Sequence, residues 1–225
     1  MQAVVFDWDG TLVDTLGALY RANLSVLEAL GLPFDETLYR RHYAPDWRLL
    51  YSRLGVPANR LDEANEHWRQ AFDAVGVGEP FPGTPEALER LRASGVRLGL
   101  VTAGDRDVVG PQITRAGLDR LIEVRVYGDD LPVHKPDPRP LRVALAELGV
   151  ADCPGEAAYV GDAPDDMRMA RAAGAAGIGI ASILGDPGEL RAAGATAVAR
   201  SVVEWVEELL ASAGDPAAAR VRRPA

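Results

Sequence analysis

Short apolar segments that alternate with helical patterns constrain the fold of this chain more than any other feature. There are six of them, three of which end in Gly or Asp: AVVFD (3–7), VRLGLVT (96–102), EVRVYG (123–128), AAYVGD (157–162), AGIGIA (176–181) and TAVA (196–199). Their length and β-branched residues predict strands. Strands that alternate with helices form βαβ units and a parallel sheet covered on both faces. We therefore expect an α/β protein with a Rossmann-like, doubly wound parallel sheet.

The segments between these strands carry helix signals. TPEALERLRASG (84–95) has Thr84 where an N-cap is expected, Pro85 at the first helical position and a glycine at its end. RPLRVALAELG (139–149) places its apolar residues on one face, and PDDMRMARAAG (164–174) begins with acidic residues and ends on glycine. These segments are predicted to be helices that cover the sheet.

One long insertion interrupts the alternation, because residues 15–80 contain no strand pattern. They predict three or four helices, at about 15–30, 36–43, 46–54 and 58–75. We expect them to form an all-helical cap domain, residues 15–81, over the carboxyl ends of the strands, where α/β sheets bind ligands. The core domain is then predicted to comprise residues 1–14 and 82–212, and residues 213–225 to form a flexible tail.

The composition narrows the classes of function. A net charge of −9 over 225 residues argues against a nucleic-acid surface and against an anionic membrane. It leaves room for a locally positive pocket that takes a small anionic substrate. The single cysteine excludes an internal disulfide and a cysteine metal cluster. No apolar run approaches the ~20 residues of a membrane span, and no secretory signal is expected, so we predict a cytoplasmic protein. We expect it to be a monomer or a homodimer.

Carboxylates gather at the ends of two predicted strands. In VVFDWDGTLVD, Asp7 ends the first strand and Asp9 follows two residues later. In VGDAPDD, Asp162 ends another strand, and Asp165 and Asp166 begin the next helix. Such groups are costly beside an apolar strand unless a cation or proton shares the site. They suit a hard cation such as Mg²⁺, a nucleophile and a proton carrier. The alternatives are turn aspartates at strand ends and, for Asp165, a charge that complements the helix dipole.

Two further positions fit the binding of a phosphoryl group. Thr102 ends a third predicted strand, and its hydroxyl and the following backbone N–H, at Ala103, can hold phosphoryl oxygens, although a threonine there is often without function. Lys135 is the only lysine among 24 lysines and arginines. A compact ammonium fits a crowded pocket where a planar guanidinium does not. The alternative is that this one lysine is present by chance. The bond from Lys135 to Pro136 is a candidate for the cis form.

These pieces, in this order, resemble the motifs of the haloacid dehalogenase (HAD) superfamily, in members that carry a small helical cap of the first type between the first and second motifs. The resemblance covers roughly residues 3–200, and the four motifs together are highly specific. The matching residues are, in chain order, Asp7 and Asp9 in DWDGT, Thr102 in GLVTAGD, Lys135 in HKPDP, and Asp162 and Asp166 in GDAPDD.

The resemblance implies a Mg²⁺-dependent phosphatase. Asp7 would attack phosphorus and become an aspartyl phosphate. Asp9 would protonate the leaving alkoxide and then activate the hydrolytic water. The implied metal site comprises Asp7, the backbone carbonyl of Asp9, and Asp162, with Asp166, or Asp166 and Asp165, in support. The implied phosphate-binding residues are Thr102, Ala103 and Lys135.

Three features of the sequence indicate which branch of the superfamily the chain resembles. Members that dehalogenate lack the second acid, which is present here as Asp9. Phosphonate-cleaving members need a cap lysine, and the predicted cap has none. β-Phosphoglucomutase-like members carry a histidine where Leu19 stands in DTLGAL. The resemblance therefore implies a phosphoglycolate phosphatase-like hydrolase of a small phosphorylated metabolite. A phosphotransferase, a nucleotide or pyrophosphate hydrolase, and a non-catalytic binding protein on the same fold stay open.

Substrate choice is expected to lie in the cap. RRHYAPDWRLL (40–50) clusters arginines with aromatic residues. Arg48 is a candidate for contact with a substrate carboxylate or second phosphate, with Trp47 as a wall. The alternative is that the arginines are solvated helix residues and that Trp47 packs within the cap.

Overall fold

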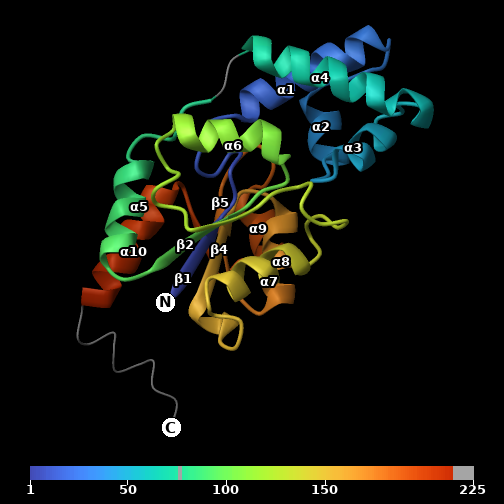
Figure 1. The fold of residues 1–225 in the computed structure, drawn as a ribbon. Helices are drawn as coiled ribbons and strands as arrows, with labels where there is room; N and C mark the ends of the chain where they lie inside the picture. The colour runs from blue at the N-terminus through green and yellow to red at the C-terminus, as the bar shows by residue number, and fades with distance from the viewer. Residues whose placement is uncertain (76–77, 215–225) are drawn as a thin grey trace.

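A computed structural model describes residues 1–75 and 78–214 of the chain. Within it, a six-stranded parallel sheet has the order β3-β2-β1-β4-β5-β6 (Figure 1). Its strands match the predicted ones to within two residues at each end, and this confirms the α/β fold with a doubly wound parallel sheet. Their bounds are β1 Ala3–Phe6, β2 Arg97–Val101, β3 Val124–Val126, β4 Ala157–Gly161, β5 Ala176–Ile180 and β6 Ala197–Ala199.

Helices cover both faces of the sheet. Successive side chains of a strand point to opposite faces, and both faces of this sheet are apolar and buried. In β1, Val4 and Phe6 belong to one buried cluster with apolar residues of three helices, and Ala3 and Val5 belong to another. The first cluster includes residues of α5 (Thr84–Ala93), α6 (Arg106–Arg115) and α10 (Val202–Gly214). The second includes residues of α7 (Arg139–Glu147) and α8 (Pro164–Ala173), and α9 (Pro187–Ala193) packs against α8 (Figure 1).

The insertion after β1 is helical, as predicted, and sits above the carboxyl ends of the strands (Figure 1). Long helices α1 and α4 lie side by side, and the shorter α2 and α3 pack against them through an aromatic and aliphatic cluster. Leu184 and Ala163 of the sheet domain join that cluster, so the insertion rests on the sheet domain through apolar contact. The bounds are α1 Leu16–Ala29, α2 Glu36–His42, α3 Trp47–Arg53, η1 Ala58–Arg60 and α4 Leu61–Val75.

Two linkers join the helical insertion to the sheet, and they run side by side. The N–H of Asp14 donates to the carbonyl of Glu79 at 3.0 Å, and the N–H of Phe81 donates to the carbonyl of Leu12 at 3.0 Å. The predicted division into a cap of residues 15–81 and a core of residues 1–14 and 82–212 stays a prediction. Residues 213 and 214 belong to α10, and the rest of the predicted tail, 215–225, lies outside the described residues.

The predicted N-cap of α5 is wrong by one residue. Thr84 is the first helical residue, and Gly83 occupies the N-cap position with φ of 81°. The Thr84 side chain is fully buried, so its hydroxyl is turned into the core instead of toward the free N–H groups of the first turn. The predicted cis form of the Lys135–Pro136 bond is confirmed. In the described part of the chain, none of the helices combines the length and apolarity that a membrane span requires.

Candidate active site

The loop after β1 brings two carboxyl groups to the end of the sheet. Asp7 is held in line with the strand, since its N–H donates to the carbonyl of Val160 in β4 at 2.8 Å. Asp9 lies beyond the turn, and its Oδ1 accepts a hydrogen bond of 2.6 Å from the hydroxyl of Thr15. Gly10 turns the loop with φ of 70°, and a Cβ there would lie 2.6 Å from Oδ2 of Asp162. The close approach of this loop to β4 therefore requires glycine.

The end of β4 supplies the second pair of carboxyl groups. Asp162 and Asp166 are buried, and each offers an oxygen to a group of three carboxylates, with Asp7, whose ligand atoms lie within 4.8 Å of one another. The Asp166 side chain is fixed by a hydrogen bond of 3.0 Å from the N–H of Ala163. Asp165 points elsewhere and pairs with Arg168 at 2.6 Å. Of the two acidic residues that begin α8, Asp166 is therefore the one in the cluster.

Lys135 supplies the positive charge in this cluster. Its Nζ lies 2.8 Å from Oδ1 of Asp7 and 2.8 Å from Oδ1 of Asp166, and its side chain is only 4% exposed. The ammonium also lies 5.3 Å from the centre of the Tyr159 ring, whose hydroxyl donates to the carbonyl of Val101. A compact ammonium suits this space, because two carboxylate oxygens lie 2.8 Å from a single nitrogen atom.

The electrostatics of the cluster favour a bound cation. Burial raises the pKa of Asp7 to about 7 against the opposing effect of Lys135. Burial, with Asp166 and Asp7 nearby, raises the pKa of Asp162 well above its usual value. Burial disfavours the charged form of Lys135, but Asp166 and Asp7 outweigh it and raise the lysine pKa. One ammonium does not balance three buried carboxylates, and oxygen donors at this spacing fit Mg²⁺.

The predicted phosphate-binding residues of the second motif lie beside this cluster. Thr102 follows β2 and is buried, and its Oγ1 accepts a hydrogen bond of 3.1 Å from the N–H of Gly104. A Cβ on Gly104 would lie 3.6 Å from Oγ1 of Thr102 and 3.9 Å from Oδ2 of Asp9, so the two loops face each other. Ala103 lines the same cavity as Asp7 and Asp9.

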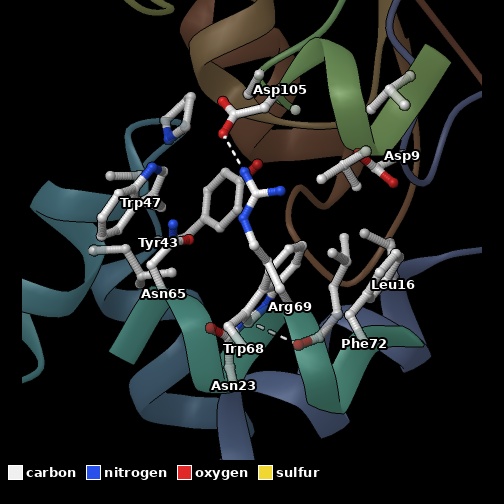
Figure 2. Close-up of a pocket in the computed structure, with 18 of the residues that line it drawn as sticks. Asp9, Leu16, Asn23, Tyr43, Trp47, Asn65, Trp68, Arg69, Phe72 and Asp105 are labelled. Carbon is white, nitrogen blue, oxygen red and sulfur yellow. Dashed lines mark hydrogen bonds and ion pairs between the residues drawn. The ribbon is translucent and has the colours of Figure 1, made fainter. Parts of the chain in front are cut away.

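A cavity of about 130 Å³ opens from Asp7 and Asp9 toward the helical insertion. In Figure 2, Asp9 stands at one side of the cavity, and Tyr43, Trp47, Trp68 and Phe72 wall it opposite the sheet. Asp9 is half-buried, and its partial removal from water raises the pKa of its carboxyl group, while the hydrogen bond from Thr15 opposes that effect. A carboxyl group that has a raised pKa and faces a cavity is suited to exchange a proton with a bound ligand.

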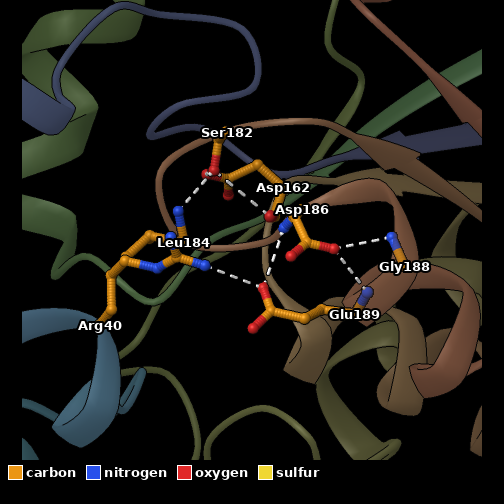
Figure 3. Close-up of polar contacts among 7 residues, drawn as sticks. All are labelled: Arg40, Asp162, Ser182, Leu184, Asp186, Gly188 and Glu189. Carbon is orange, nitrogen blue, oxygen red and sulfur yellow. Dashed lines mark hydrogen bonds and ion pairs between the residues drawn. The ribbon is translucent and has the colours of Figure 1, made fainter. Parts of the chain in front are cut away.

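The loop after β5 holds Asp162 in place. The hydroxyl of Ser182 donates to Oδ2 of Asp162 at 2.7 Å and in turn accepts from the N–H of Leu184 at 2.9 Å (Figure 3). Beyond this loop, Arg40 of α2 reaches Glu189 of α9 at 3.1 Å, which ties the insertion to the sheet domain at the surface. The sequence predicted neither Ser182 nor Thr15 as a site residue. Ser182 is 20 residues away in sequence from the Asp162 that it contacts, and Thr15 lies at the N-cap position of α1, where a threonine is usually explained by the helix end.

Comparison with known proteins identifies the family. The family model described as "Haloacid dehalogenase-like hydrolase" matches residues 4–180, which include all four clusters of polar residues described above. The chain belongs to the haloacid dehalogenase-like hydrolase family.

Several known proteins are similar to the chain over most of its length. A phosphoglycolate phosphatase of Rhodospirillum rubrum is 36% identical over 188 residues, 77% of this chain and 76% of that protein. A phosphorylated carbohydrates phosphatase of Thermotoga maritima is 29% identical over 220 residues, 93% of this chain and all of that protein. The crystal structure of a hydrolase from Pseudomonas syringae, 27% identical, superimposes with a TM-score of 0.84 and covers 94% of this chain and 99% of that one.

In this HAD-like hydrolase, Arg48 does not line the cavity. Its side chain is exposed, and its guanidinium stacks on the ring of Trp47 with 4.2 Å to the ring centre. The predicted contact of Arg48 with substrate finds no support in this arrangement. The arginine that does line the cavity is Arg69 of α4. Sequence reasoning missed it, because a helix pattern indicates which residues share a face but not what that face meets.

Proposed function

We propose that this HAD-like hydrolase is a Mg²⁺-dependent phosphatase that hydrolyses a small organic phosphate monoester through an aspartyl phosphate on Asp7. One observation carries the proposal: three buried carboxylates and one buried ammonium converge where a half-buried fourth carboxyl, Asp9, faces a cavity beneath the helical insertion. The similarity to phosphatases supports the same reaction class.

In the first step, an oxygen of Asp7 attacks phosphorus and the bond from phosphorus to the ester oxygen breaks. Asp9, whose raised pKa favours the protonated form, gives its proton to the departing oxygen, so that an alcohol leaves. In the second step, water attacks phosphorus of the aspartyl phosphate, and Asp9 takes a proton from that water. The bond from phosphorus to Asp7 breaks, inorganic phosphate is released, and the free carboxylate of Asp7 is restored.

The other polar residues hold the phosphoryl group in place. Lys135 donates from a single nitrogen that already touches Asp7, and so it can bridge the attacking carboxylate and a phosphoryl oxygen. The hydroxyl of Thr102 and the backbone N–H of Ala103 are assigned to the remaining oxygens. Positive charge and oriented donors there stabilise the charge that develops during transfer.

Mg²⁺ would be held by the carboxylates of Asp7 and Asp162 and the backbone carbonyl of Asp9, with Asp166 supporting the site. When bound, it would neutralise charge on the phosphoryl oxygens. Ser182 fixes the orientation of Asp162 by its 2.7 Å hydrogen bond, and the N–H of Ala163 fixes that of Asp166. The role of these two contacts is to hold the carboxylates ready for the ion.

The test is phosphate release from a panel of monoesters that includes phosphoglycolate, sugar phosphates, a nucleotide, pyrophosphate and p-nitrophenyl phosphate, with Mg²⁺ and with chelator. Asp7→Asn should abolish release. Asp165→Asn is the matched control, since Asp165 pairs with Arg168 at the surface, and it should leave release close to that of the wild type. Release that persists in Asp7→Asn, or that does not depend on Mg²⁺, would contradict the proposal.

A further inference from the structure

The cavity wall opposite Asp9 carries a guanidinium that two carboxylates already neutralise. Arg69 of α4 reaches across from the helical insertion to the loop that follows β2 (Figure 2). Its Nη1 lies 2.6 Å from Oδ2 of Asp107, and its Nη2 lies 3.1 Å from Oδ2 of Asp105. The Arg69 side chain is 30% exposed, so these ion pairs lie at the cavity wall and are partly shielded from water.

This wall has no spare positive charge. Among the cavity-lining residues within 1–75 and 78–214, Arg69 is the only arginine or lysine, whereas Asp105 lines the cavity beside it. Asp129 adds a further negative charge, since burial and then Asp129 raise the pKa of Asp105. Arg48 lies close enough to Asp105 to lower its pKa, but its guanidinium stacks on the ring of Trp47 and Arg48 does not line the cavity. A second anion on a substrate would therefore meet, at this wall, an arginine that is already paired with Asp105 and Asp107, and the carboxylate of Asp105 beside it.

The rest of the cavity offers neutral groups that suit hydroxyls. The hydroxyl of Tyr51 is buried and lacks a hydrogen-bond partner within the described residues, and Tyr51 lines the cavity. The side-chain amide of Asn65 lines it as well (Figure 2). Trp47 and Trp68 add flat apolar walls, on which the carbon face of a polyol or sugar can pack. A buried polar group without a partner is satisfied when a ligand hydroxyl reaches it.

We propose that Asp105 and Asp107 neutralise Arg69 and thereby make the cavity select phosphate monoesters of uncharged, hydroxylated leaving groups over those that carry a second anion. This inference rests on the proposed phosphatase function and names its substrate class. Arg69, held by Asp105 and Asp107, is the specificity-determining residue, and the orphan hydroxyl of Tyr51 is the group assigned to a substrate hydroxyl.

A matched pair of substrates tests the inference. Glycerol 3-phosphate and 3-phosphoglycerate differ only in a CH₂OH group that is replaced by a carboxylate. The wild-type enzyme should have a kcat/KM for glycerol 3-phosphate about tenfold or more above that for 3-phosphoglycerate. A second pair, 2-hydroxyethyl phosphate and phosphoglycolate, should give the same order. Equal or reversed values in both pairs would overturn the inference.

The double variant Asp105→Asn, Asp107→Asn tests the assigned cause. It frees the charge of Arg69, so the ratio of the two kcat/KM values should move about tenfold toward 3-phosphoglycerate, chiefly through KM. Asp62→Asn, Asp73→Asn is the matched control, because it changes the net charge equally at exposed positions of α4 and should leave the ratio unchanged. An unchanged ratio in the first variant, or an equal shift in both, would overturn the role of Asp105 and Asp107.

Thermal melts of each variant separate this effect from misfolding. If the double variant does not fold, Arg69→Gln replaces it: the two carboxylates then lose their cation, and the preference for glycerol 3-phosphate should rise. A ratio that stays fixed or falls in Arg69→Gln would contradict the inference. The proposed phosphatase function fails in a different way, by the absence of phosphate release from all of these esters and from p-nitrophenyl phosphate.

Discussion

The ammonium of Lys135 lies 2.8 Å from Oδ1 of Asp7, and both side chains are buried. The same nitrogen lies 2.8 Å from Oδ1 of Asp166, so a single positive charge serves two carboxylates. The chain uses lysine nowhere else. The geometry accounts for this exception, since the position needs a small cation whose donors radiate from one atom.

Replacing Lys135 should cost stability as well as activity. Lys135→Met leaves the buried carboxylates without their cation, and the free energy of unfolding in chelator at neutral pH should fall by about 3 kcal/mol. Phosphate release should fall about 100-fold or more, because a donor to the phosphoryl group is lost. Denaturant unfolding and initial rates measure the two effects.

Arg168→Met is the matched control for that variant. It breaks the pair of Arg168 with Asp165, in which the arginine side chain is 51% exposed, and it should cost less than about 1 kcal/mol. If both variants lost the same stability, the buried ion pairs of Lys135 would contribute no more to stability than an exposed pair, and the assigned role of Lys135 would be wrong.

Metal removal should make stability depend on pH in a defined window. Burial raises the pKa of Asp7 from its usual 3.8 to about 7 in the folded, metal-free protein. Between these values the folded state binds a proton that the unfolded state has released, so the free energy of unfolding falls as pH rises from about 4 to about 7. Asp162, whose pKa is also raised, acts in the same direction. The raised pKa of Lys135 acts only above the usual range of lysine, outside this window.

Added Mg²⁺ should reverse that loss, because the ion binds the ionised carboxylates of the folded state alone. At pH 7.5 the gain should reach about 2.7 kcal/mol when the free ion is 100 times its Kd, and it should shrink toward pH 5. Thermal melts across this range, with chelator and with Mg²⁺, measure it. A gain that is the same at both pH values would contradict the link between Asp7 ionisation and metal binding.

The fold and the centre of the site were predictable from the sequence for one physical reason. Parallel strands end at the same edge of a sheet, so Asp7, Thr102 and Asp162, each at the end of an apolar segment, had to converge. Lys135 was indicated by its isolation in the composition. The family resemblance followed from the same residues, and the helical insertion from the lack of a strand pattern in residues 15–80; the family and the fold are confirmed.

What the sequence did not indicate depends on how separate elements meet. The contact of Arg69 with Asp105 joins residues 36 positions apart, across the interface between the insertion and the sheet domain. The arginines and aromatic residues of segment 40–50 indicated Arg48 as a substrate contact, yet Arg48 is exposed and stacks on Trp47. Thr84 carried the N-cap signal, but burial of its side chain took the hydroxyl away from the helix end. The roles assigned to individual site residues stay predictions.

Activity should require glycine at position 10, because the turn after Asp9 has no room for a side chain. Gly10→Ala would place a Cβ 2.6 Å from Oδ2 of Asp162 and 2.8 Å from Cδ1 of Leu16, at φ of 70°. The expected result is a loss of roughly 1–2 kcal/mol from the left-handed backbone and a fall in Mg²⁺-dependent phosphate release as Asp162 is displaced.

Gly31→Ala separates the two causes. Gly31 has nearly the same φ, 68°, but a Cβ there would meet nothing within 4 Å. This variant should lose similar stability and keep wild-type release. If Gly10→Ala also kept wild-type release, close packing of the loop on Asp162 would not matter for activity.

Ser182 should tune metal affinity without touching substrate. Its hydroxyl donates to Oδ2 of Asp162 at 2.7 Å, and its Oγ is in turn held by the N–H of Leu184. Ser182→Ala removes the donor that orients a proposed metal ligand, so the Kd for Mg²⁺ should rise about tenfold, by calorimetric titration of the free enzyme. At saturating Mg²⁺, KM for the substrate should stay close to that of the wild type. Ser94→Ala, which removes a hydroxyl bonded to the carbonyl of Leu91 at the end of α5, is the control and should leave the Kd for Mg²⁺ unchanged. A Kd unaltered in Ser182→Ala would mean that Asp162 is oriented by the loop backbone and Gly10 alone.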